Sequence, residues 1–227
     1  MRTAAQWLFI ICLPVLLLTG SIGVVANSLG TWLAEYGSER YGVARTLAYT
    51  GLELTDSELA QVYDGLVSYF NSDEEYISLT VVSDGLEFDL FTPEEVIHFK
   101  DVNGLIWLDY WLFLGTLSYM LAYTGVSFFW RKDRRRLLQG LAWSGGLTVV
   151  LILALVLLDA LFGFGELWYR FHLVFFSNEF WSAEGYMLLL FPEVFFADAA
   201  IFCALVTAVG ALIMGGVGWW RLKKGSQ

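Results

Sequence analysis

Four long apolar segments dominate the pattern of hydrophobic and polar positions along the chain. They run from Trp7 to Ala26, from Tyr110 to Trp130, from Leu137 to Phe162 and from Ala200 to Trp220. Each segment reaches the roughly 20 residues that a helix needs to cross the hydrocarbon layer of a bilayer. The strands of a membrane barrel would alternate in polarity, and these runs do not. The pattern therefore predicts four transmembrane helices.

The basic residues predict the orientation of these helices. Positive charge is retained on the cytoplasmic side of a membrane. The basic side chains cluster in the loop after the second span and in the tail after the fourth: Arg131, Lys132, Arg134, Arg135, Arg136, Arg221, Lys223 and Lys224. Both termini and this loop are therefore predicted to be cytoplasmic. Apart from Asp133, the acidic residues fall in outer segments or near the outer ends of spans, so the net charge of -10 belongs to the outer face and indicates no nucleic-acid partner.

The predicted architecture is an α-helical membrane protein with a four-transmembrane-helix bundle. A small mixed α+β extracytoplasmic domain lies between the first and second spans. Residues 1–27 form the first transmembrane helix, 28–109 the outer domain, 110–130 the second helix, 131–136 the basic loop, 137–162 the third helix, 163–198 an outer, interfacial aromatic segment, 199–220 the fourth helix and 221–227 the cytoplasmic tail. The first span is long for the apolar region of a signal peptide, so we expect a retained anchor.

Local signals organise the outer domain. Thr55 and Glu58 form a capping box before a helical pattern. The stretch 76–82 is rich in β-branched and aromatic residues, 83–85 reads Ser-Asp-Gly, and 86–91 alternates apolar and acidic residues, which predicts a hairpin. A second helix start follows, with Thr92 as N-cap, Pro93 in the first helical position and Glu95 closing another capping box.

The chain has only two histidines, and both fall in outer segments. His98 lies in the second turn of the helix that begins at Pro93. Glu94 and Asp101 lie four residues before and three after it, which places both carboxylates on the histidine's face of the helix. A carboxylate beside a histidine orients the ring and fixes its tautomer. We therefore expect Asp101 or Glu94 to hold His98 through one ring nitrogen.

The second histidine, His172, lies in the aromatic outer segment. This segment also carries polar residues that could support chemistry, among them Arg170 and Asn178, and Glu193 follows Pro192 before the last span. Because histidine titrates near neutral pH, two histidines at one membrane interface suggest an acid–base site. A buried histidine that simply satisfies its hydrogen bonds is the structural alternative for His172.

Other chemistries receive less support from the sequence. It contains no nucleophile elbow, phosphate-binding loop, dinucleotide fingerprint or zinc-protease motif. His98, Asp101 and His172 could form a set of two histidines and one carboxylate around a metal, but nothing requires a metal or another cofactor. A metal-dependent membrane lipid hydrolase therefore remains open. So does a non-catalytic membrane protein whose outer domain binds a partner or senses pH.

Three short elements resemble those of one known family. The first is His98-Phe-Lys-Asp101-Val after Phe-Thr-Pro-Glu-Glu, and the second is Phe-His172, then Phe-Phe-Ser-Asn178, then Trp181. The third is Phe191-Pro-Glu193 followed by Phe-Phe. Their order, spacing and four-span layout resemble the bacterial lipoprotein intramolecular transacylases (Lit). The segment between Trp181 and Phe191 is shorter than that family's pattern and lacks its Asp-Pro element.

The resemblance implies an enzyme of the bacterial plasma membrane that acts on diacylated lipoproteins among membrane lipids. It would move the sn-2 acyl chain from the glyceryl group to the amine of the lipoprotein's N-terminal cysteine, giving the lyso-form, without cofactor or metal. His98 and His172 would be the catalytic acid and base, in an order left open. Asp101, Glu94, Asn178, Arg170 and Glu193 would support them, with Asn178, Arg170 or a backbone N–H as the oxyanion donor.

This mechanism carries a geometric expectation. Two histidines that exchange protons with one substrate must both lie within reach of it. We therefore expect the imidazoles to face one another across a cleft at the outer membrane boundary, about 4–8 Å apart. The cleft would be apolar toward lipid and polar toward solvent.

Overall fold

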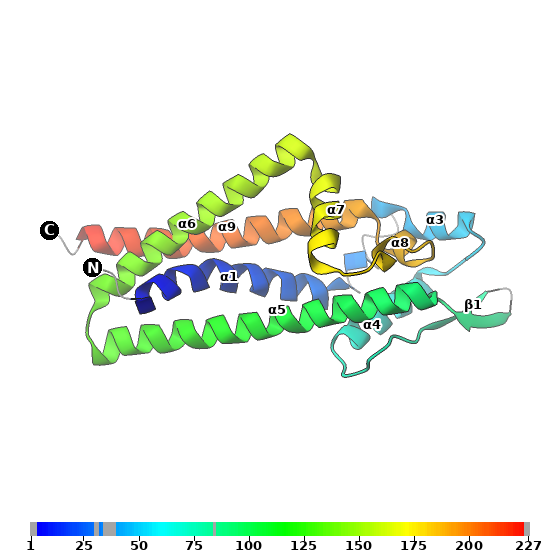
Figure 1. Ribbon diagram of the computed structural model, residues 1–227, viewed down its shortest axis with the longest axis horizontal. Helices are drawn as coiled ribbons and strands as arrows, with labels where there is room; N and C mark the ends of the chain where they lie inside the picture. Colours follow the sequence, from blue (N-terminus) through cyan, green and yellow to red (C-terminus); the bar gives the residue numbers. More distant parts are fainter. Residues whose placement is uncertain (1–3, 30–31, 34–39, 84, 225–227) are drawn as a thin grey trace. The chain divides into compact units, whose positions relative to one another are not determined.

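The structure is a computed structural model that describes residues 4–29, 32–33, 40–83 and 85–224. The predictions for residues 1–3, for Asp84 in the hairpin turn and for residues 225–227 lie outside this part. The described chain is mostly helical (Figure 1). In chain order the elements are α1 (Ala4–Asn27), α3 (Val43–Tyr49), α4 (Asp56–Phe70), β1 (Thr80–Ser83), β2 (Leu86–Asp89), α5 (Pro93–Gly125), a π-helical turn (Val126–Trp130), α6 (Arg134–Phe162), α7 (Phe164–Phe175), a 3₁₀ turn (Phe180–Ser182), α8 (Met187–Leu190) and α9 (Glu193–Lys224).

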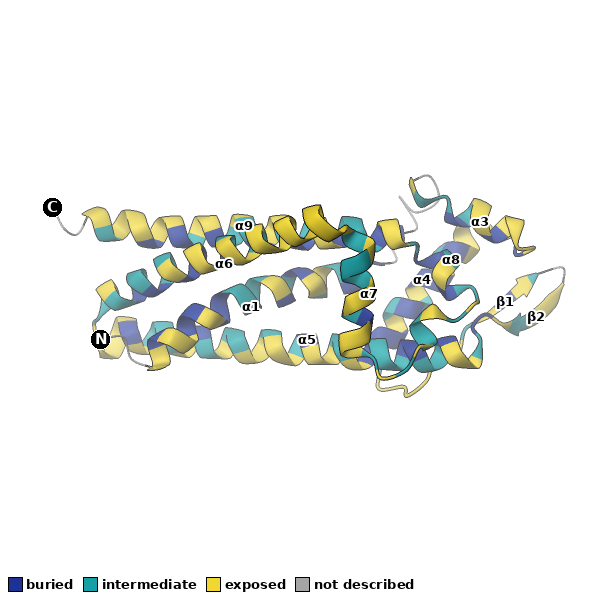
Figure 2. Cartoon of the chain, turned by 45° about the horizontal axis from the view of Figure 1, so that its top comes forward, coloured by how far each residue is buried: buried dark blue, intermediate teal, exposed yellow. Residues whose placement is uncertain are grey.

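Four helices are long and apolar enough to cross a membrane, as the hydrophobic pattern predicts. They are α1, α5 with its π-helical turn, α6 and α9. Many of their large apolar side chains are exposed, and residues 151–162 of α6 are almost continuously so (Figure 2). Exposed apolar surface of this extent is suited to contact with lipid chains. The chain is therefore a multi-pass membrane protein.

The chain divides into two compact units, and the first holds most of this membrane-spanning part. It comprises residues 1–23, 108–163 and 200–227. In it α6 and α9 approach so closely that a Cβ added to Gly145 would lie 2.6 Å from the carbonyl oxygen of Ala211 and 2.7 Å from the Cα of Gly215. Small residues allow such contacts between membrane helices, where packing replaces the hydrophobic effect as the source of association.

Polar contacts add to the packing within this membrane unit. The Ser144 hydroxyl donates a hydrogen bond to the carbonyl oxygen of Ile10 at 2.7 Å, which joins α6 to α1. The Gln6 amide donates to the carbonyl oxygen of Arg136, again between these two helices. Tyr119 of α5 donates to the carbonyl oxygen of Ala5 at 2.6 Å. Hydrogen bonds between helices contribute stability in lipid without requiring large apolar burial.

The second unit comprises residues 24–107 and 164–199 and has its own hydrophobic core. Helix α4 places its apolar face in this core, with Tyr63 and Leu66 fully buried. The Tyr63 hydroxyl donates a hydrogen bond to the carbonyl oxygen of Leu190 in α8 at 3.0 Å. Phe195, at the start of α9, is also buried there. The two outer segments predicted from the sequence thus share one core, although residues 110–162 separate them in the chain.

The local predictions in this unit are confirmed. Both halves of the Thr55–Glu58 capping box are present at the start of α4. Thr92 accepts from the backbone N–H of Glu95, and the Glu95 carboxylate accepts from the backbone N–H of Thr92 at 2.9 Å. Strands β1 and β2 pair in antiparallel register with Ser83 opposite Leu86.

The outer domain differs from its prediction in one respect. In the described residues its sheet consists of two four-residue strands, so helices form most of it.

Helix α5 continues without interruption from Pro93 to Gly125, across the boundary predicted at residue 109, and the two compact units divide within it, between residues 107 and 108. Proline is absent between Asn103 and Gly125, and an isolated Gly104 costs a helix only about 1 kcal/mol relative to Ala. One helix therefore begins in the second unit and ends in the membrane unit.

Candidate active site

His98 occupies the second turn of α5, and its position depends on how that helix begins. Pro93 presets the first helical φ angle, and the Thr92–Glu95 capping box satisfies backbone N–H groups that a helix start leaves unpaired. His98 itself is 6% exposed. A fixed helix start therefore holds the ring inside the unit.

Glu95 also ties this helix start to a distant segment. The carboxylate is fully buried, and its second oxygen accepts a hydrogen bond from the backbone N–H of Met187 at 2.6 Å. Gly185 packs directly against the same carboxylate, at a distance that leaves no room for a Cβ. Hydrogen bonds to an ionised group are stronger than neutral ones, and a buried charge requires them. Glu95 therefore joins the first turn of α5 to α8.

His172 lies in the last turns of the twelve-residue helix α7 and is 5% exposed. Its Nδ1 lies 2.7 Å from the carbonyl oxygen of Trp168, one helical turn earlier. Because a carbonyl oxygen only accepts, the hydrogen bond places the proton of the neutral ring on Nδ1. Nε2 then carries the lone pair and is the nitrogen available to take a proton.

Aromatic side chains enclose the His172 ring. The ring centroid of Trp168 lies 4.5 Å from that of His172, nearly perpendicular to it, and the Trp181 ring lies 4.8 Å away. Burial lowers the pKa of His172 below its usual value, and the hydrogen bond to Trp168 opposes this only in part. Desolvation disfavours the charged form of a histidine. His172 is therefore a neutral base near pH 7.

The two histidines face one another. Their ring centroids are 6.1 Å apart with an angle of 32° between the planes, which lies within the separation expected from the sequence. Phe176 contacts both rings, at 4.8 Å from His98 and 5.4 Å from His172. A nucleophile and the carbon it attacks lie about 3–3.5 Å apart in a reactive complex. Two imidazoles at this separation can therefore reach the two ends of one reacting group.

The prediction that Asp101 or Glu94 holds His98 is wrong. Among the residues that the structure describes, none hydrogen-bonds the buried Nδ1 of His98. Asp101 instead accepts a hydrogen bond from the Asn178 amide at 2.9 Å, and Glu94 is exposed. Spacing along one helix showed which residues share a face of α5, but Asp101 accepts its hydrogen bond from a donor on another segment.

Asn178 links the segment after α7 to helix α5. Its amide nitrogen donates to Asp101, one turn beyond His98, and its amide oxygen accepts from the backbone N–H of Phe180 at 3.0 Å. The Asp101–Asn178 pair thus joins the helix that carries His98 to the chain six residues beyond His172. This contact positions the two histidines relative to one another.

The two other candidate residues, Arg170 and Glu193, contact side chains and backbone other than the two histidines. Arg170 is exposed and pairs with Glu166 in the same helix at 2.7 Å. The carboxylate of Glu193 packs against Gly165, within the first turn of α7, so that a Cβ at residue 165 would lie 2.9 Å from it. A negative charge is favourable at a helix N-terminus. Glu193 is thus placed to stabilise the start of α7.

The metal set suggested by the sequence is not assembled. In the described part of the chain, no three His, Cys, Asp or Glu side chains are grouped so that they could hold a metal ion. Asp101 is oriented by the hydrogen bond from Asn178. The site is therefore a pair of imidazoles in an aromatic surrounding.

Sequence reasoning missed two residues that shape this site. The carbonyl of Trp168 orients His172, and the four-residue spacing between them in a helical pattern could have indicated it. The bond between Glu95 and Met187 spans 92 positions, and no local signal reveals it.

Comparison with known proteins gives a consistent result. A family model for the lipoprotein intramolecular transacylase Lit matches residues 7–196. An in meso structure of the lipoprotein intramolecular transacylase Lit from Bacillus cereus is 19% identical, with a TM-score of 0.76, over 98% of this chain and 96% of that one. Two variants of the same protein, with one histidine replaced by alanine or by arginine, match with TM-scores of 0.72 and 0.68 at 19% identity over 98% of this chain and 94% and 95% of theirs.

The search of curated proteins found no match. The likeness to the solved structures establishes the fold, since the sequence identity is low. The family model covers most of the chain, including both histidines. The protein belongs to the lipoprotein intramolecular transacylase (Lit) family.

Proposed function

We propose that this protein transfers an acyl chain within a diacylated lipoprotein. The sn-2 chain moves from the glyceryl oxygen to the α-amine of the N-terminal cysteine, and the product is the lyso-form lipoprotein. The observation that carries the proposal is the facing pair His98 and His172, 6.1 Å apart, in a member of a transacylase family. The partner is the lipoprotein, presented from the membrane.

The chemistry needs a base for the amine. An α-amine has a pKa of about 8, and it must be neutral to attack and must lose a proton as it does so. The orientation of His172 supports it as this base, because its Nδ1–H is committed to Trp168 and its Nε2 is free to accept. Its lowered pKa keeps the ring neutral and therefore ready.

The reaction balances without a further reactant. A C–N bond forms between the cysteine nitrogen and the acyl carbonyl carbon, and the ester C–O bond breaks. The proton from the amine passes through the imidazole pair to the departing glyceryl oxygen, which becomes a hydroxyl. Two imidazolium ions side by side would repel one another, so a single proton shared by the pair is the favourable state.

Positioning supplies much of the remaining rate enhancement. Amine and ester belong to one molecule, and well-oriented intramolecular reactions reach effective molarities of about 10⁵–10⁸ M. Acid–base catalysis typically contributes on the order of 10²–10⁴-fold. The Asp101–Asn178 and Glu95–Met187 contacts support this role, because they fix the helices that carry the histidines.

Mass spectrometry of lipoprotein N-termini, with and without expression of this gene, tests the proposal. Expression should convert diacylglyceryl lipoproteins into forms with an N-acyl cysteine and one remaining ester chain. His98→Gln and His172→Gln should abolish the conversion, while Lys100→Gln, which removes a surface ion pair with Glu75 and a surface contact with Tyr76, should retain it. Identical N-termini with and without expression would refute the function. Conversion by both histidine variants would leave the function but refute the acid–base pair.

A further inference from the structure

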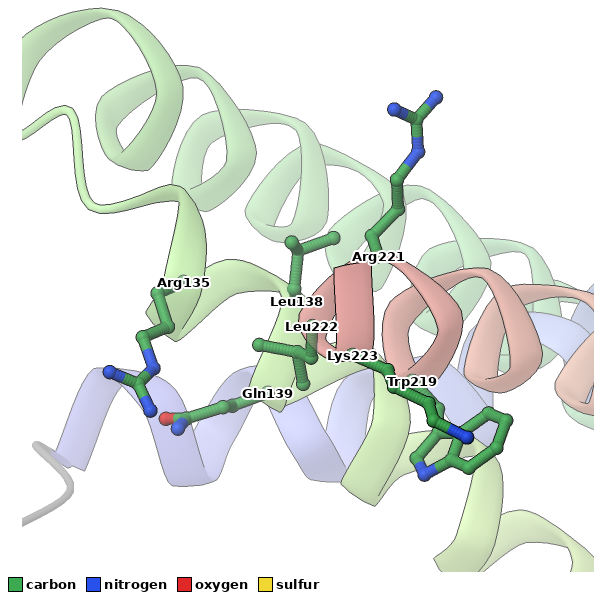
Figure 3. Close-up of a pocket in the computed structure, with 7 residues that line it drawn as sticks. All are labelled: Arg135, Leu138, Gln139, Trp219, Arg221, Leu222 and Lys223. Carbon is green, nitrogen blue, oxygen red and sulfur yellow. The ribbon is translucent and has the colours of Figure 1, made fainter. Parts of the chain in front are cut away.

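The membrane unit contains a pocket that the transacylase site does not use. It lies where α6 begins and α9 ends, within the membrane unit, and has a volume of about 440 Å³ (Figure 3). These are the chain segments that the sequence predicts to be cytoplasmic. The lining combines cationic side chains with the apolar groups of Trp219, Leu138 and Leu222.

Two helical pairs form the walls of the pocket. Arg135 and Gln139 are four residues apart on α6, so both project from one face, and Trp219 and Lys223 have the same spacing on α9. The Lys223 ammonium lies 5.4 Å from the centroid of the Trp219 ring. In Figure 3 the guanidinium of Arg135 and the amide of Gln139 form one side and Lys223 with Trp219 the other, whereas Arg221 points away from both.

Basic side chains outnumber acidic ones in the described residues at this end. In the described ranges 131–136 and 221–224, eight side chains are basic and only Asp133 is acidic. Asp133 is already engaged, because it caps α6 by accepting from the backbone N–H of Arg136 and forms an ion pair with the Arg136 side chain. No described carboxylate forms an ion pair with Arg135.

The helix that carries Arg135 adds to the positive field. Three arginines occupy the first turn of α6, where the helix dipole is also positive and where acidic side chains would normally be favourable. An anion bound there would relieve this repulsion and accept hydrogen bonds. Arginine binds phosphate with two parallel N–H groups, and lysine adds a point charge.

We propose that this pocket binds the phosphodiester headgroup of an anionic phospholipid from the leaflet at the basic end. Arg135 contacts the phosphate, Gln139 donates a hydrogen bond to it or to the headgroup, and Lys223 on the opposite wall adds positive charge. Trp219 with the two leucines contacts the glycerol and first chain methylenes. The apolar part of the lining favours a lipid over free phosphate. Basic pockets between membrane helices on the cytoplasmic side are suited to such headgroups.

Native mass spectrometry of the full chain in detergent micelles tests this site. The protein is titrated with phosphatidylglycerol, with phosphatidylcholine of the same acyl chains, and with inorganic phosphate alone. The expected result is one phosphatidylglycerol bound in preference to phosphatidylcholine. The double variant Arg135→Gln/Lys223→Gln should weaken phosphatidylglycerol binding on the order of 10-fold and leave phosphatidylcholine binding unchanged.

A matched control distinguishes binding at this pocket from a general attraction of anionic lipid to the basic loop and tail. Arg131→Gln/Lys224→Gln removes one charge from the same loop and one from the same tail, but neither residue lines the pocket. It should retain the wild-type preference. Arg135→Lys, which keeps the charge and loses the fork of donors, should give an intermediate affinity even if the double variant folds poorly. Equal losses in the two double variants, no lipid preference in the wild type, or phosphate binding as tight as lipid binding would overturn the assignment.

Discussion

At the level of single residues, His172 shows how one backbone contact decides what a ring can do. Its Nδ1 is committed to the carbonyl of Trp168, so the neutral ring offers only Nε2 to a substrate. The surrounding aromatic side chains exclude water from it. His98 differs, because its buried Nδ1 has no hydrogen-bond partner in the described part of the chain. The two histidines thus start from unequal environments, which suits unequal roles in one proton transfer.

The lowered pKa of His172 predicts the acid side of the activity profile. A base must be deprotonated, and a pKa below the usual value of about 6.5 keeps the ring neutral at lower pH. We therefore expect kcat/KM for acyl transfer, calculated per neutral substrate amine because that amine has a pKa of about 8, to stay high as pH falls through 6.5 and to decline only below it. A pH series with a synthetic diacylated lipopeptide would measure this limb.

Trp181→Ala supplies the comparison for this pH profile. Removing the indole, whose centroid lies 4.8 Å from that of His172, admits water to the ring and raises its pKa toward the ordinary value. The acid limb should then move to higher pH. A wild-type limb at or above pH 6.5, or a variant limb that moves to lower pH, would contradict His172 as the desolvated base.

The sequence indicated the two histidines for a simple reason. They are the only two in an apolar chain, and the topology predicted from the sequence places both on one side. It assigned the wrong partner to Asp101, because helix spacing shows which residues share a face and not which donors arrive from elsewhere. Asn178, 77 positions away in the sequence, donates the hydrogen bond that the Asp101 carboxylate accepts.

At the level of elements, Glu95 serves two helices at once. One oxygen completes the capping box of α5, and the other accepts from the backbone N–H of Met187 at α8. Glu95→Gln replaces one acceptor by an NH₂ group that must face a backbone donor. Leaving a buried donor unpaired costs about 1–3 kcal/mol.

Glu95→Gln should therefore lower the melting temperature in detergent by several degrees, with a loss of about 2 kcal/mol in stability. Glu94→Gln makes the same chemical change at the neighbouring, exposed position and should alter stability by less than about 0.5 kcal/mol. Equal melting temperatures for the two variants would mean that the Glu95 link does not stabilise the unit.

The Asp101–Asn178 pair allows a test by exchange. Asn178→Asp places two carboxylates together in a half-buried position, so repulsion should separate the segment after α7 from α5 and lower transacylation at least 10-fold. The double variant Asp101→Asn/Asn178→Asp restores one donor and one acceptor with their positions exchanged. It should recover much of the lost activity, measured by the same lipopeptide assay. A double variant as inactive as Asn178→Asp would show that Asp101 has a role beyond positioning.

Elements set by local chemistry were predictable, and those set by distant contacts were not. Both capping boxes and the hairpin depend on residues within a few positions of each other. The continuity of α5 from the second unit into the span follows from a local signal as well, because residues 94–125 contain no proline. The sharing of one core by α4 and α8, through the Tyr63–Leu190 hydrogen bond, depends on tertiary packing that no sequence pattern encodes.

At the level of the whole molecule, each of the two units is stabilised by a different kind of packing. In the membrane unit, close contact at Gly145 and Gly215 and buried hydroxyl bonds such as that of Ser144 join the helices. In the second unit, an aromatic and aliphatic core resembles that of a water-soluble domain. The hydrophobic pattern predicted the four membrane helices, because the thickness of the bilayer sets the length of an apolar spanning segment. Which residues form the core of the second unit was harder to predict, because they come from two segments that are separated in the chain.

The distribution of charge predicts the orientation of the chain in the membrane. Since basic loops stay cytoplasmic, the loop 131–136 should be inside and the unit with both histidines outside. In a background with Cys12→Ala and Cys203→Ala, a single thiol introduced by Ser78→Cys, at an exposed site of the second unit, should react with a membrane-impermeant maleimide in intact cells. A thiol introduced by Arg131→Cys should react only after the membrane is permeabilised, and the remaining basic residues of its loop preserve the orientation signal. Labelling of both thiols after permeabilisation shows that each is accessible. If Arg131→Cys reacts in intact cells and Ser78→Cys does not, the chain has the opposite orientation, and a site for lipoproteins on the outer surface is excluded.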